Sequence, residues 1–472
     1  MSFFQLAVLV ASLLTASSHA AGVTGSPAGF ASGTTGGGSA VAAAPSDIAE
    51  LKLWLSDAEA RVILIDKEFD FTGSGGMCTD CECCIPTSNA CGSAGQNAIV
   101  NSLTWCDPYP KTTCTYDKTG QSGLEVASNK SIVGVGDGAV IRGQGLRFVN
   151  GNTNIIVQNV HITDINPQYI WGGDAIYMDD TDLIWLDHVK ISLVGRQMIS
   201  MGFNSNGRVT ISNTEFDGQT SWSASCDGHH YWTILGLGLN DKVSFYNNWL
   251  HHTSGRSPDI GYPSTWHFFN NYWSNNTGHA FSVTADSSVL VEGNVFDDVK
   301  TTMEGEPAGV FVVNSTTSSA CSTTLGRTCY ENIVLNSGSL TPQSMANQTT
   351  LDALVSAKEP AVAISAATDV ASYVVANAGI GKLGSSEQAS GTSSVSPSAS
   401  PTSSFTTSSA TTLATKAAKT TSTFTSSATT LATKASKTSS LSMVTQVTSA
   451  STSTQTAAAT ATAAAEDDEC EA

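Results

Sequence analysis

The sequence predicts an all-β fold, a right-handed single-stranded parallel β-helix, followed by a disordered Ser/Thr-rich tail. Six short segments alternate apolar and polar residues and carry Asn, Asp or Gly at or near their ends. They are NIIVQNV from residue 154, DLIWLDH from 182, RVTISNT from 208, KVSFYNN from 242, TWHFFNN from 265 and SVLVEGN from 288. Their starts are 23–34 residues apart, and asparagines recur at 248, 271 and 294, as expected when coils stack strand on strand. A β-sandwich would account for short strands but not for asparagines at this spacing.

The N-terminus predicts secretion. Residues 3–14, FFQLAVLVASLL, form an apolar run that is followed by Ser18-His19-Ala20, a plausible cleavage site, although no basic residue precedes the run. A buried helix is the alternative, and the run is too short to span a bilayer. We therefore expect a signal peptide at residues 1–20 and an extracellular protein.

The rest of the chain divides into a folded body, residues 21–385, and a tail, residues 386–472. The body begins with a glycine-rich segment, AGVTGSPAGFASGTTGGG, and PSDIAELKLWL then predicts a helix that Asp47 caps and in which Glu50 completes a capping box. RVILIDKEFDF follows and is typical of a strand. The tail is Ser, Thr and Ala with SSATTLATKA repeated, so it cannot bury enough apolar surface to fold and is expected to be an O-glycosylated stalk.

Eleven cysteines indicate an oxidising compartment. The stretch CTDCECC has a spacing that also occurs in metal sites, but disulfides are favoured in a secreted chain. The odd count leaves one thiol over, most simply Cys470. Four N-x-S/T sequons predict glycosylation at Asn129, Asn275, Asn314 and Asn347.

The formal net charge of −19 argues against nucleic acid and anionic membranes as partners. It also makes a neutral substrate easier to bind than a polyanion. We expect a soluble monomer.

The longer steps between strand segments contain inserted loops, where function is usually located. These loops supply aromatic and charged residues, the combination that a saccharide site needs. They are Trp171, Asp174, Arg196, Trp222, Tyr231, Trp232 and Arg256. Core packing is the expected role of most tryptophans, including Trp185 within DLIWLDH, whereas Trp171 lies beside two glycines and is a site candidate.

Two other groups of residues suggest chemistry less strongly. A calcium cluster or a glycosidase pair could be built from Asp174, Asp179, Asp180 and Asp182, although strand capping and solvated surface explain such residues as well. Histidines occur in the pairs His229-His230 and His251-His252. Adjacent residues in an extended chain point to opposite faces, so neither pair is a convincing metal site.

These motifs resemble the fungal-type pectin lyases of the pectate lyase superfamily, polysaccharide lyase family 1. The resemblance covers nearly the whole folded body and follows the order GVTGSPAGFASGTTGGGSA, NKSIVGVG, TDINPQYIWGGDAI, WLDHV, VGRQMI, CDGHHYW, SGRSP and EGNVFDDV. It implies a right-handed parallel β-helix with asparagine stacks. It also implies an enzyme that cleaves α-1,4-linked methyl-esterified galacturonan by β-elimination and leaves a 4,5-unsaturated sugar.

The resemblance assigns roles to three charged residues. Arg256 in SGRSP matches the catalytic arginine, which is proposed to take the C5 proton. Because a guanidinium is normally protonated, Arg256 could instead stabilise the developing enolate while water takes the proton. Arg196 matches the arginine near the vacant calcium position, and Asp174 matches an acidic residue that can pair with it. We therefore expect no catalytic calcium and no other cofactor.

The same matching assigns substrate-binding aromatics and disulfides. Trp171, Tyr231 and Trp232 match positions near the cleft. The matched disulfides are Cys84–Cys106, Cys91–Cys226 and Cys321–Cys329. The pairing of the cysteines at 78, 81, 83 and 114 stays open.

One residue departs from the family pattern. The family usually has a lysine three residues after the catalytic arginine, and this chain has Asp259. A carboxylate there would stabilise the charged form of Arg256. Asp259 therefore leaves a non-catalytic pectin-binding homologue as one alternative. A calcium-dependent pectate lyase is the other, and Arg196 and the net negative charge disfavour it. A polygalacturonase is disfavoured because its Asn-Thr-Asp, Gly-His-Gly and Arg-Ile-Lys elements are missing.

Overall fold

The computed structural model describes residues 22–101, 104–284, 286–305, 308–340 and 347–383. The predicted signal peptide and the whole of the predicted tail, with Cys470, lie outside these residues. Among the helices that the structure describes, none is long and apolar enough to cross a membrane.

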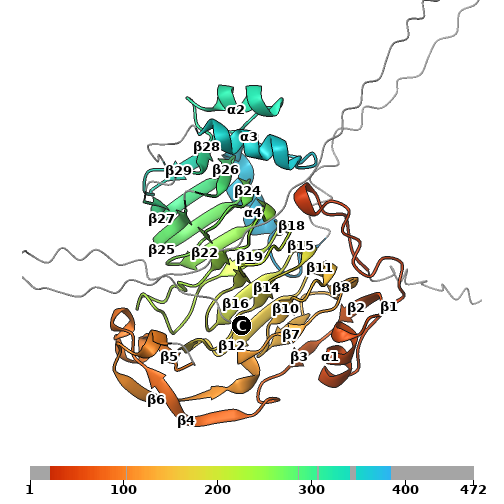
Figure 1. The fold of residues 1–472 in the computed structure, drawn as a ribbon, viewed down its shortest axis with the longest axis vertical. Helices are drawn as coiled ribbons and strands as arrows, with labels where there is room; N and C mark the ends of the chain where they lie inside the picture. The colour runs from red at the N-terminus through yellow and green to blue at the C-terminus, as the bar shows by residue number, and fades with distance from the viewer. Residues whose placement is uncertain (1–21, 102–103, 285, 306–307, 341–346, 384–472) are drawn as a thin grey trace, which may run out of the picture. The chain divides into compact units, whose positions relative to one another are not determined.

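A ten-stranded sheet contains the six segments that the sequence singled out. Its strands lie side by side and stack from β1 and β2 to β28 (Figure 1). In order they are β1 (Ala42–Ala43), β2 (Arg61–Ile65), β8 (Lys130–Gly134), β11 (Thr153–Gln158), β15 (Asp182–Asp187), β18 (Arg208–Ser212), β21 (Lys242–Tyr246), β24 (Thr265–Phe269), β26 (Ser288–Glu292) and β28 (Val310–Val312). The paired strands are parallel, so the predicted parallel β-helix is confirmed.

Each coil adds two further strands, which the sequence did not reveal. They form two series within a fifteen-stranded sheet. The first series is β3 (Glu68–Asp70), β9 (Val140–Arg142), β12 (His161–Ile165), β16 (Lys190–Val194), β19 (Glu215–Asp217) and β22 (Trp249–Thr253). The second is β7 (Leu124–Glu125), β10 (Leu146–Phe148), β14 (Ile176–Met178), β17 (Ile199–Met201), β20 (Ile234–Gly236) and β23 (Asp259–Ile260). The long strand β25 (Tyr272–Val283) joins the two series and pairs with β27 (Val295–Glu304), which in turn pairs with β29 (Ile333–Leu335).

The core fills the inside of the coils. Alternate residues of each strand point inward, so Ile184 and Leu186 of β15 lie over Val209 and Ile211 of β18, all fully buried. This regular stacking satisfies the strand ladders and removes apolar side chains from water at the same time. Trp185, predicted as core, is also buried, and its indole N–H donates to Ser212 Oγ at 3.0 Å.

The predicted asparagine stack is confirmed. The Nδ2 group of Asn248 donates to Oδ1 of Asn271 at 3.1 Å, and Asn271 donates likewise to Asn294 at 3.0 Å. Asn294 continues the stack to Asn332 at 3.0 Å. Asn332 was missed because an insertion places it 38 residues further on. The residue before Asn271, Asn270, has φ +54°, a left-handed conformation that asparagine tolerates in a tight turn.

The N-terminal elements largely match the sequence. Helix α1 (Ile48–Ser56) is capped by Asp47, which accepts hydrogen bonds from the N–H groups of Ala49 and Glu50. The Glu50 carboxylate accepts from the Ser46 N–H, one residue earlier than the expected capping box. RVILIDKEFDF forms two strands, β2 and β3, because the chain turns between them.

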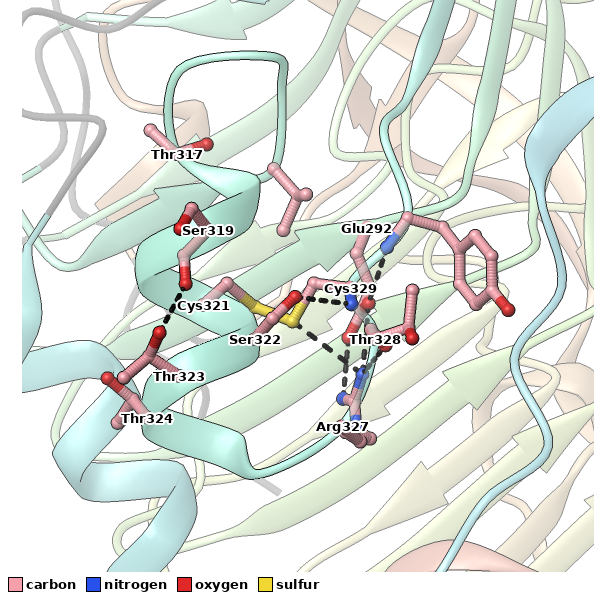
Figure 2. The surroundings of a disulfide bond; sticks show 12 residues. Glu292, Thr317, Ser319, Cys321, Ser322, Thr323, Thr324, Arg327, Thr328 and Cys329 are labelled. Carbon is pink, nitrogen blue, oxygen red and sulfur yellow. Dashed lines mark hydrogen bonds and ion pairs between the residues drawn. A yellow bond between two sulfur atoms is a disulfide. The ribbon is translucent and has the colours of Figure 1, made fainter.

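All three predicted disulfides are present, Cys84–Cys106, Cys91–Cys226 and Cys321–Cys329. The open cysteines pair as Cys78–Cys81 and Cys83–Cys114, so CTDCECC is a disulfide segment. It lies in β4 (Met77–Cys84), which is antiparallel to β6 (Lys111–Asp117) and to β5 (Asn97–Ile99), with β13 (Tyr169–Ile170) beside β5. Figure 2 shows Cys321 of α2 (Ser318–Leu325) bridged to Cys329.

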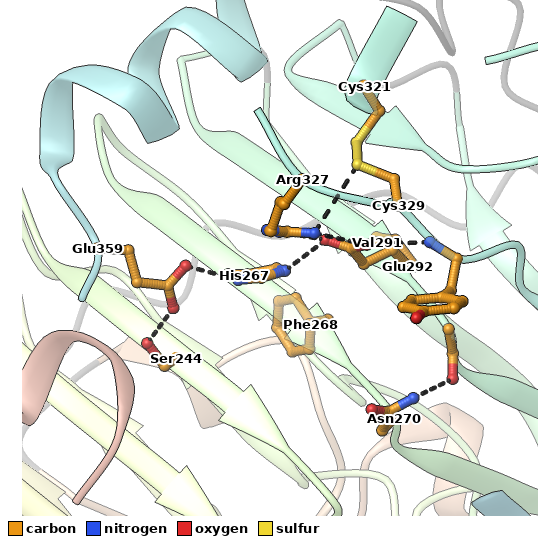
Figure 3. Close-up of polar contacts among 12 residues, drawn as sticks. Ser244, His267, Phe268, Asn270, Val291, Glu292, Cys321, Arg327, Cys329 and Glu359 are labelled. Atoms are coloured by element: carbon orange, nitrogen blue, oxygen red, sulfur yellow. Dashed lines mark hydrogen bonds and ion pairs between the residues drawn. A yellow bond between two sulfur atoms is a disulfide. The ribbon is translucent and has the colours of Figure 1, made fainter. Parts of the chain in front are cut away.

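A buried ionic network fastens the C-terminal part of the chain to the outer face of the ten-stranded sheet (Figure 3). We call it the clamp. His267 contacts Glu292 at 2.9 Å and Glu359 at 2.6 Å, and Arg327 contacts Glu292 at 2.6 Å. Glu359 follows α3 (Gln348–Ala357), and α4 (Val370–Asn377) lies further along. Burial lowers the pKa of His267, but the charge of Glu359 and the hydrogen bonds to both carboxylates outweigh it and raise the pKa to about 9.

Candidate active site

Arg256 lies between β22 and β23 and is held by the coils on both sides. Its backbone N–H donates to Nε2 of His279 at 3.0 Å, and its carbonyl accepts from the Ile234 N–H at 2.6 Å. The residue has φ +44°. Gly255 precedes it where a Cβ would overlap the ring of Tyr231, so the SGR turn requires glycine there. Arg256 is therefore a fixed residue of the coil rather than a surface charge.

The Arg256 side chain is oriented by an indole and a carboxylate. Its Cζ atom lies 4.9 Å from the centroid of the Trp232 ring, a cation–π distance. Its Nε atom lies 3.5 Å from Oδ2 of Asp259. Burial raises the pKa of Asp259, and the charge of Arg256 opposes that effect.

Arg196 repeats this arrangement two coils earlier. Its Cζ atom lies 4.2 Å from the centroid of the Trp171 ring, and its Nη1 atom lies 3.7 Å from Oδ2 of Asp174. The Gln197 N–H donates to the other oxygen of Asp174 at 2.8 Å. Burial raises the pKa of Asp174, and the charges of Arg196 and Arg256 act in the opposite direction.

His230 ties the two arginine neighbourhoods together. Its Nε2 atom lies 2.8 Å from the carbonyl of Arg196 and 3.0 Å from that of Trp232. Two carbonyl acceptors require a proton on Nε2. Burial lowers the pKa of His230 to about 4, so the ring is neutral near pH 7 and serves as a donor.

The site is a column built by successive coils. Asp174, Arg196, Trp232 and Arg256 each come two or three residues before a strand of the second series, namely β14, β17, β20 and β23. These strands pair in order, so the residues before them are brought to one edge of the sheet. An arrangement of two cations, half-buried carboxylates and aromatic rings can bind a sugar chain and stabilise negative charge on it.

Comparisons with known proteins agree with this geometry. Residues 93–383 match the family model described as pectate lyase. The chain belongs to the pectate lyase family. A relative named probable pectin lyase F-2, from Aspergillus terreus, is 58% identical over 402 residues, which cover 85% of this chain and 82% of the relative. Probable pectin lyase F of Aspergillus niger is 58% identical over 396 residues, covering 83% and 82% of the two chains.

Solved structures show the same fold at low identity. A polygalacturonate lyase fused to a self-assembling amphipathic peptide has a TM-score of 0.51 and 17% identity, covering 77% of this chain and 99% of its own. A variant of the Bacillus subtilis pectate lyase has a TM-score of 0.50 and 16% identity, with the same coverage. Membership in the pectate lyase family confirms the predicted resemblance and the enzyme class, a polysaccharide lyase.

In this pectate lyase family member, the structure brings together all six residues predicted for catalysis and substrate binding. Tyr231 joins them through its ring contact with Trp232, at 4.9 Å between centroids. The other acidic residues of the predicted calcium or glycosidase group serve the coils instead. Asp179 accepts the Asn204 N–H at 2.8 Å, and Asp182 pairs with Arg208 at 2.5 Å.

Sequence reasoning missed His230 and His279 as parts of the site and misjudged the second histidine pair. His251 and His252 do not point to opposite faces, because their Nδ1 atoms lie 2.8 Å apart. His252 has φ +53°, so the strand is not regular there. Histidine adopts this conformation more often than most non-glycine residues, but the HH pair does not show which of its two residues will adopt it.

Proposed function

We propose that the protein is a secreted pectin lyase that cleaves α-1,4-linked methyl-esterified galacturonan by β-elimination. The observation that carries the proposal is that two guanidinium groups lie over indole rings, at 4.2 Å for Arg196 over Trp171 and 4.9 Å for Arg256 over Trp232, with half-buried Asp174 beside Arg196. The names of the Aspergillus relatives, at 58% identity, support the same substrate.

The reaction places defined demands on the site. A proton leaves C5 of the sugar, its electron pair forms the C4=C5 double bond, and the C4–O4 bond breaks as O4 takes a proton. Negative charge develops on the ester carbonyl oxygen during proton loss, and fixed cations are needed there. Arg196 supplies such a cation without calcium, because its guanidinium already lies 3.7 Å from the Asp174 carboxylate.

Arg256 faces the same centre, and its surroundings favour its charged form. The Asp259 carboxylate at 3.5 Å and the Trp232 ring at 4.9 Å both stabilise a cation. We therefore assign Arg256 to stabilisation of the enolate, with water taking the C5 proton. The alternative, in which Arg256 itself takes that proton, requires its neutral form against these neighbours.

The remaining predictions extend this proposal. Trp171, Tyr231 and Trp232 offer ring faces for sugars, and pectin of plant cell walls is the expected partner of a monomer. We expect the protein to act outside the cell. It would consist of a signal peptide at 1–20, a folded body at 21–385 and an O-glycosylated tail at 386–472. Of the four sequons, Asn129 is exposed, and Asn275, Asn314 and Asn347 are partly exposed, which permits glycosylation.

The test is the ultraviolet absorbance of unsaturated uronide during incubation with highly methylated pectin and, in parallel, with polygalacturonate. Product from the methylated substrate alone is the expected result. Product from polygalacturonate alone would indicate a pectate lyase. Binding of pectin without product from either substrate would favour the non-catalytic homologue, with Asp259 as the first residue to revert to lysine.

A further inference from the structure

A cluster of ionisable side chains lies on the first series of strands, outside the arginine column. It contains Asp217 at the end of β19 and His251 and His252 of β22. Asp217 and His251 are paired neighbours across the two strands. One ligand atom from each of the three residues lies within 4.8 Å of the others. Among the described residues, the other such group includes Cys321 and Cys329, whose sulfurs form a disulfide.

The backbone explains how two adjacent histidines reach one point. His252 has φ +53°, and Leu193 and Asn275 have φ +51° and +52°. His252 follows His251, Leu193 follows Ser192 and Asn275 follows Ser274. The strand register aligns Ser192, His251 and Ser274. A left-handed residue interrupts the strict alternation of side chains, as in a β-bulge. The rings of His251 and His252 therefore meet at 80°, with Nδ1 atoms 2.8 Å apart.

We propose that Asp217, His251 and His252 bind one divalent transition metal ion of the Zn²⁺ class, with solvent completing the coordination. Two imidazole nitrogens and one carboxylate oxygen are a usual ligand set for zinc. The Nδ1 atom of His251 lies 3.8 Å from Oδ1 of Asp217. His252 and Asp217 are partly exposed, which leaves an entry path for the ion and its water.

The neighbours of His251 prepare it as a ligand. Its Nε2 atom lies 3.3 Å from Oε1 of Glu215. The same Oε1 atom accepts a hydrogen bond from Nζ of Lys190 at 2.8 Å, so Glu215 is placed as an acceptor for the His251 ring. The proton on Nε2 then leaves the Nδ1 lone pair directed at the cluster, the carboxylate–histidine–metal arrangement.

Lys190 does not block the site. Its Nζ atom contacts Oε1 of Glu215 at 2.8 Å and Oδ2 of Asp217 at 2.9 Å. The Oδ1 atom of Asp217 accepts only the Gln219 N–H, at 3.1 Å, among the hydrogen bonds that the described residues show. Two carboxylates, Glu215 and Asp217, surround the cluster with one ammonium, Lys190, and this excess of acidic groups favours a dication.

Metal binding requires the two histidine rings to lose the proton between them and to move slightly apart. At 2.8 Å the two Nδ1 atoms share a proton, because one must donate to the other. Tetrahedral ligands at about 2.0–2.1 Å from zinc stand roughly 3.3 Å apart, so the ion would replace that proton and separate the rings slightly. The carbonyl of His252 accepts the His230 N–H at 3.1 Å, so a bound ion would brace the segment that leads to Arg256.

The experiment uses the full chain, stripped of metal with a chelator and exchanged into chelator-free buffer. Zn²⁺ is titrated against a chromogenic competitor, and Co²⁺ is added separately to record its visible d–d absorption. The double variant His251→Gln/His252→Gln is compared with His161→Gln, which changes another histidine of the same series of strands. All of these chains keep Cys470, so any zinc bound there is common to them.

We expect one competitive Zn²⁺ per wild-type chain, binding at least about 100-fold weaker in the double variant and unchanged in His161→Gln. Glu215→Gln should weaken binding about 10–100-fold, the usual effect of losing such a partner. Co²⁺ should give an intense four-coordinate spectrum that the double variant lacks. Equal binding by wild type and double variant, or no stoichiometric binding by wild type, would overturn the proposal. If the double variant does not fold, His252→Gln alone, at a partly exposed ring, decides the question in the same way.

Discussion

The clamp and the arginine column both bury charge, but they treat it differently. In the clamp, His267 and Arg327 lie 2.6–2.9 Å from the carboxylates of Glu292 and Glu359. In the column, the ion pairs of Arg196 and Arg256 are longer, 3.7 and 3.5 Å, and each guanidinium lies over an indole. In the clamp, the short distances pair each charge with an opposite charge of the protein, so these charges stabilise the fold. In the column, the looser ion pairs orient the guanidinium groups, whose positive charge can still interact with a substrate.

The largest expected effect separates the two regions by stability. His267→Gln removes the central charge of the clamp and leaves Glu292 and Glu359 buried beside an uncharged group. We expect the free energy of unfolding to fall by about 3–5 kcal/mol. Urea denaturation measures this loss, while kcat on methylated pectin, assayed well below the melting temperature, should be unchanged. A large fall in kcat of the folded variant would remove the distinction between the regions.

Arg256→Ala should have the opposite effect, lowering kcat while leaving the free energy of unfolding nearly unchanged. Loss of one cation at the developing enolate is expected to lower kcat by about 10²–10³-fold. Pectin binding should persist, because the partly exposed rings of Trp171 and Tyr231 remain. Product absorbance measures the rate, and a melting curve checks the fold. Unaltered turnover in a folded Arg256→Ala protein would remove Arg256 from the mechanism.

The clamp should also give stability its own dependence on pH. The pKa of His267 is raised to about 9 in the folded protein, above about 6.5 for an unperturbed histidine. The stabilisation is therefore fully present below about pH 6.5 and is lost as the pH rises through 9. The difference in unfolding free energy between wild type and His267→Gln should shrink from pH 6.5 to 9.5. A constant difference over this range would mean that His267 does not carry the charge.

The smallest expected effect concerns Asp259. If Arg256 acts as a cation, Asp259→Asn removes an anion at 3.5 Å and should change kcat/KM by less than about tenfold, without a gain at neutral pH. If Arg256 takes the C5 proton, the same substitution should favour its neutral form and raise the rate. Initial rates of wild type and Asp259→Asn at pH 7 distinguish the two roles.

The sequence was informative where the coils repeat and uninformative where they do not. Asn248, Asn271 and Asn294 could be predicted as a stack because equal spacing reports equal coils. Strands β17 and β20, of three residues each, are too short to show an alternating pattern. The inserted loops identified the column residues as candidates for a saccharide site, but only the family resemblance assigned each of them a role. The sequence did not show that His252 would take a left-handed conformation, and the pairing of Cys78 with Cys81 depended on an irregularity in the pairing of β4 with β6.

The most direct test of the central claim is the dependence of the elimination rate on calcium. Initial rates on highly methylated pectin are measured after chelation and again with excess Ca²⁺. Because the Arg196 guanidinium lies 3.7 Å from Asp174 and supplies the cation there, we expect equal rates under both conditions. A rate that is lost with the chelator and restored by Ca²⁺ would contradict it.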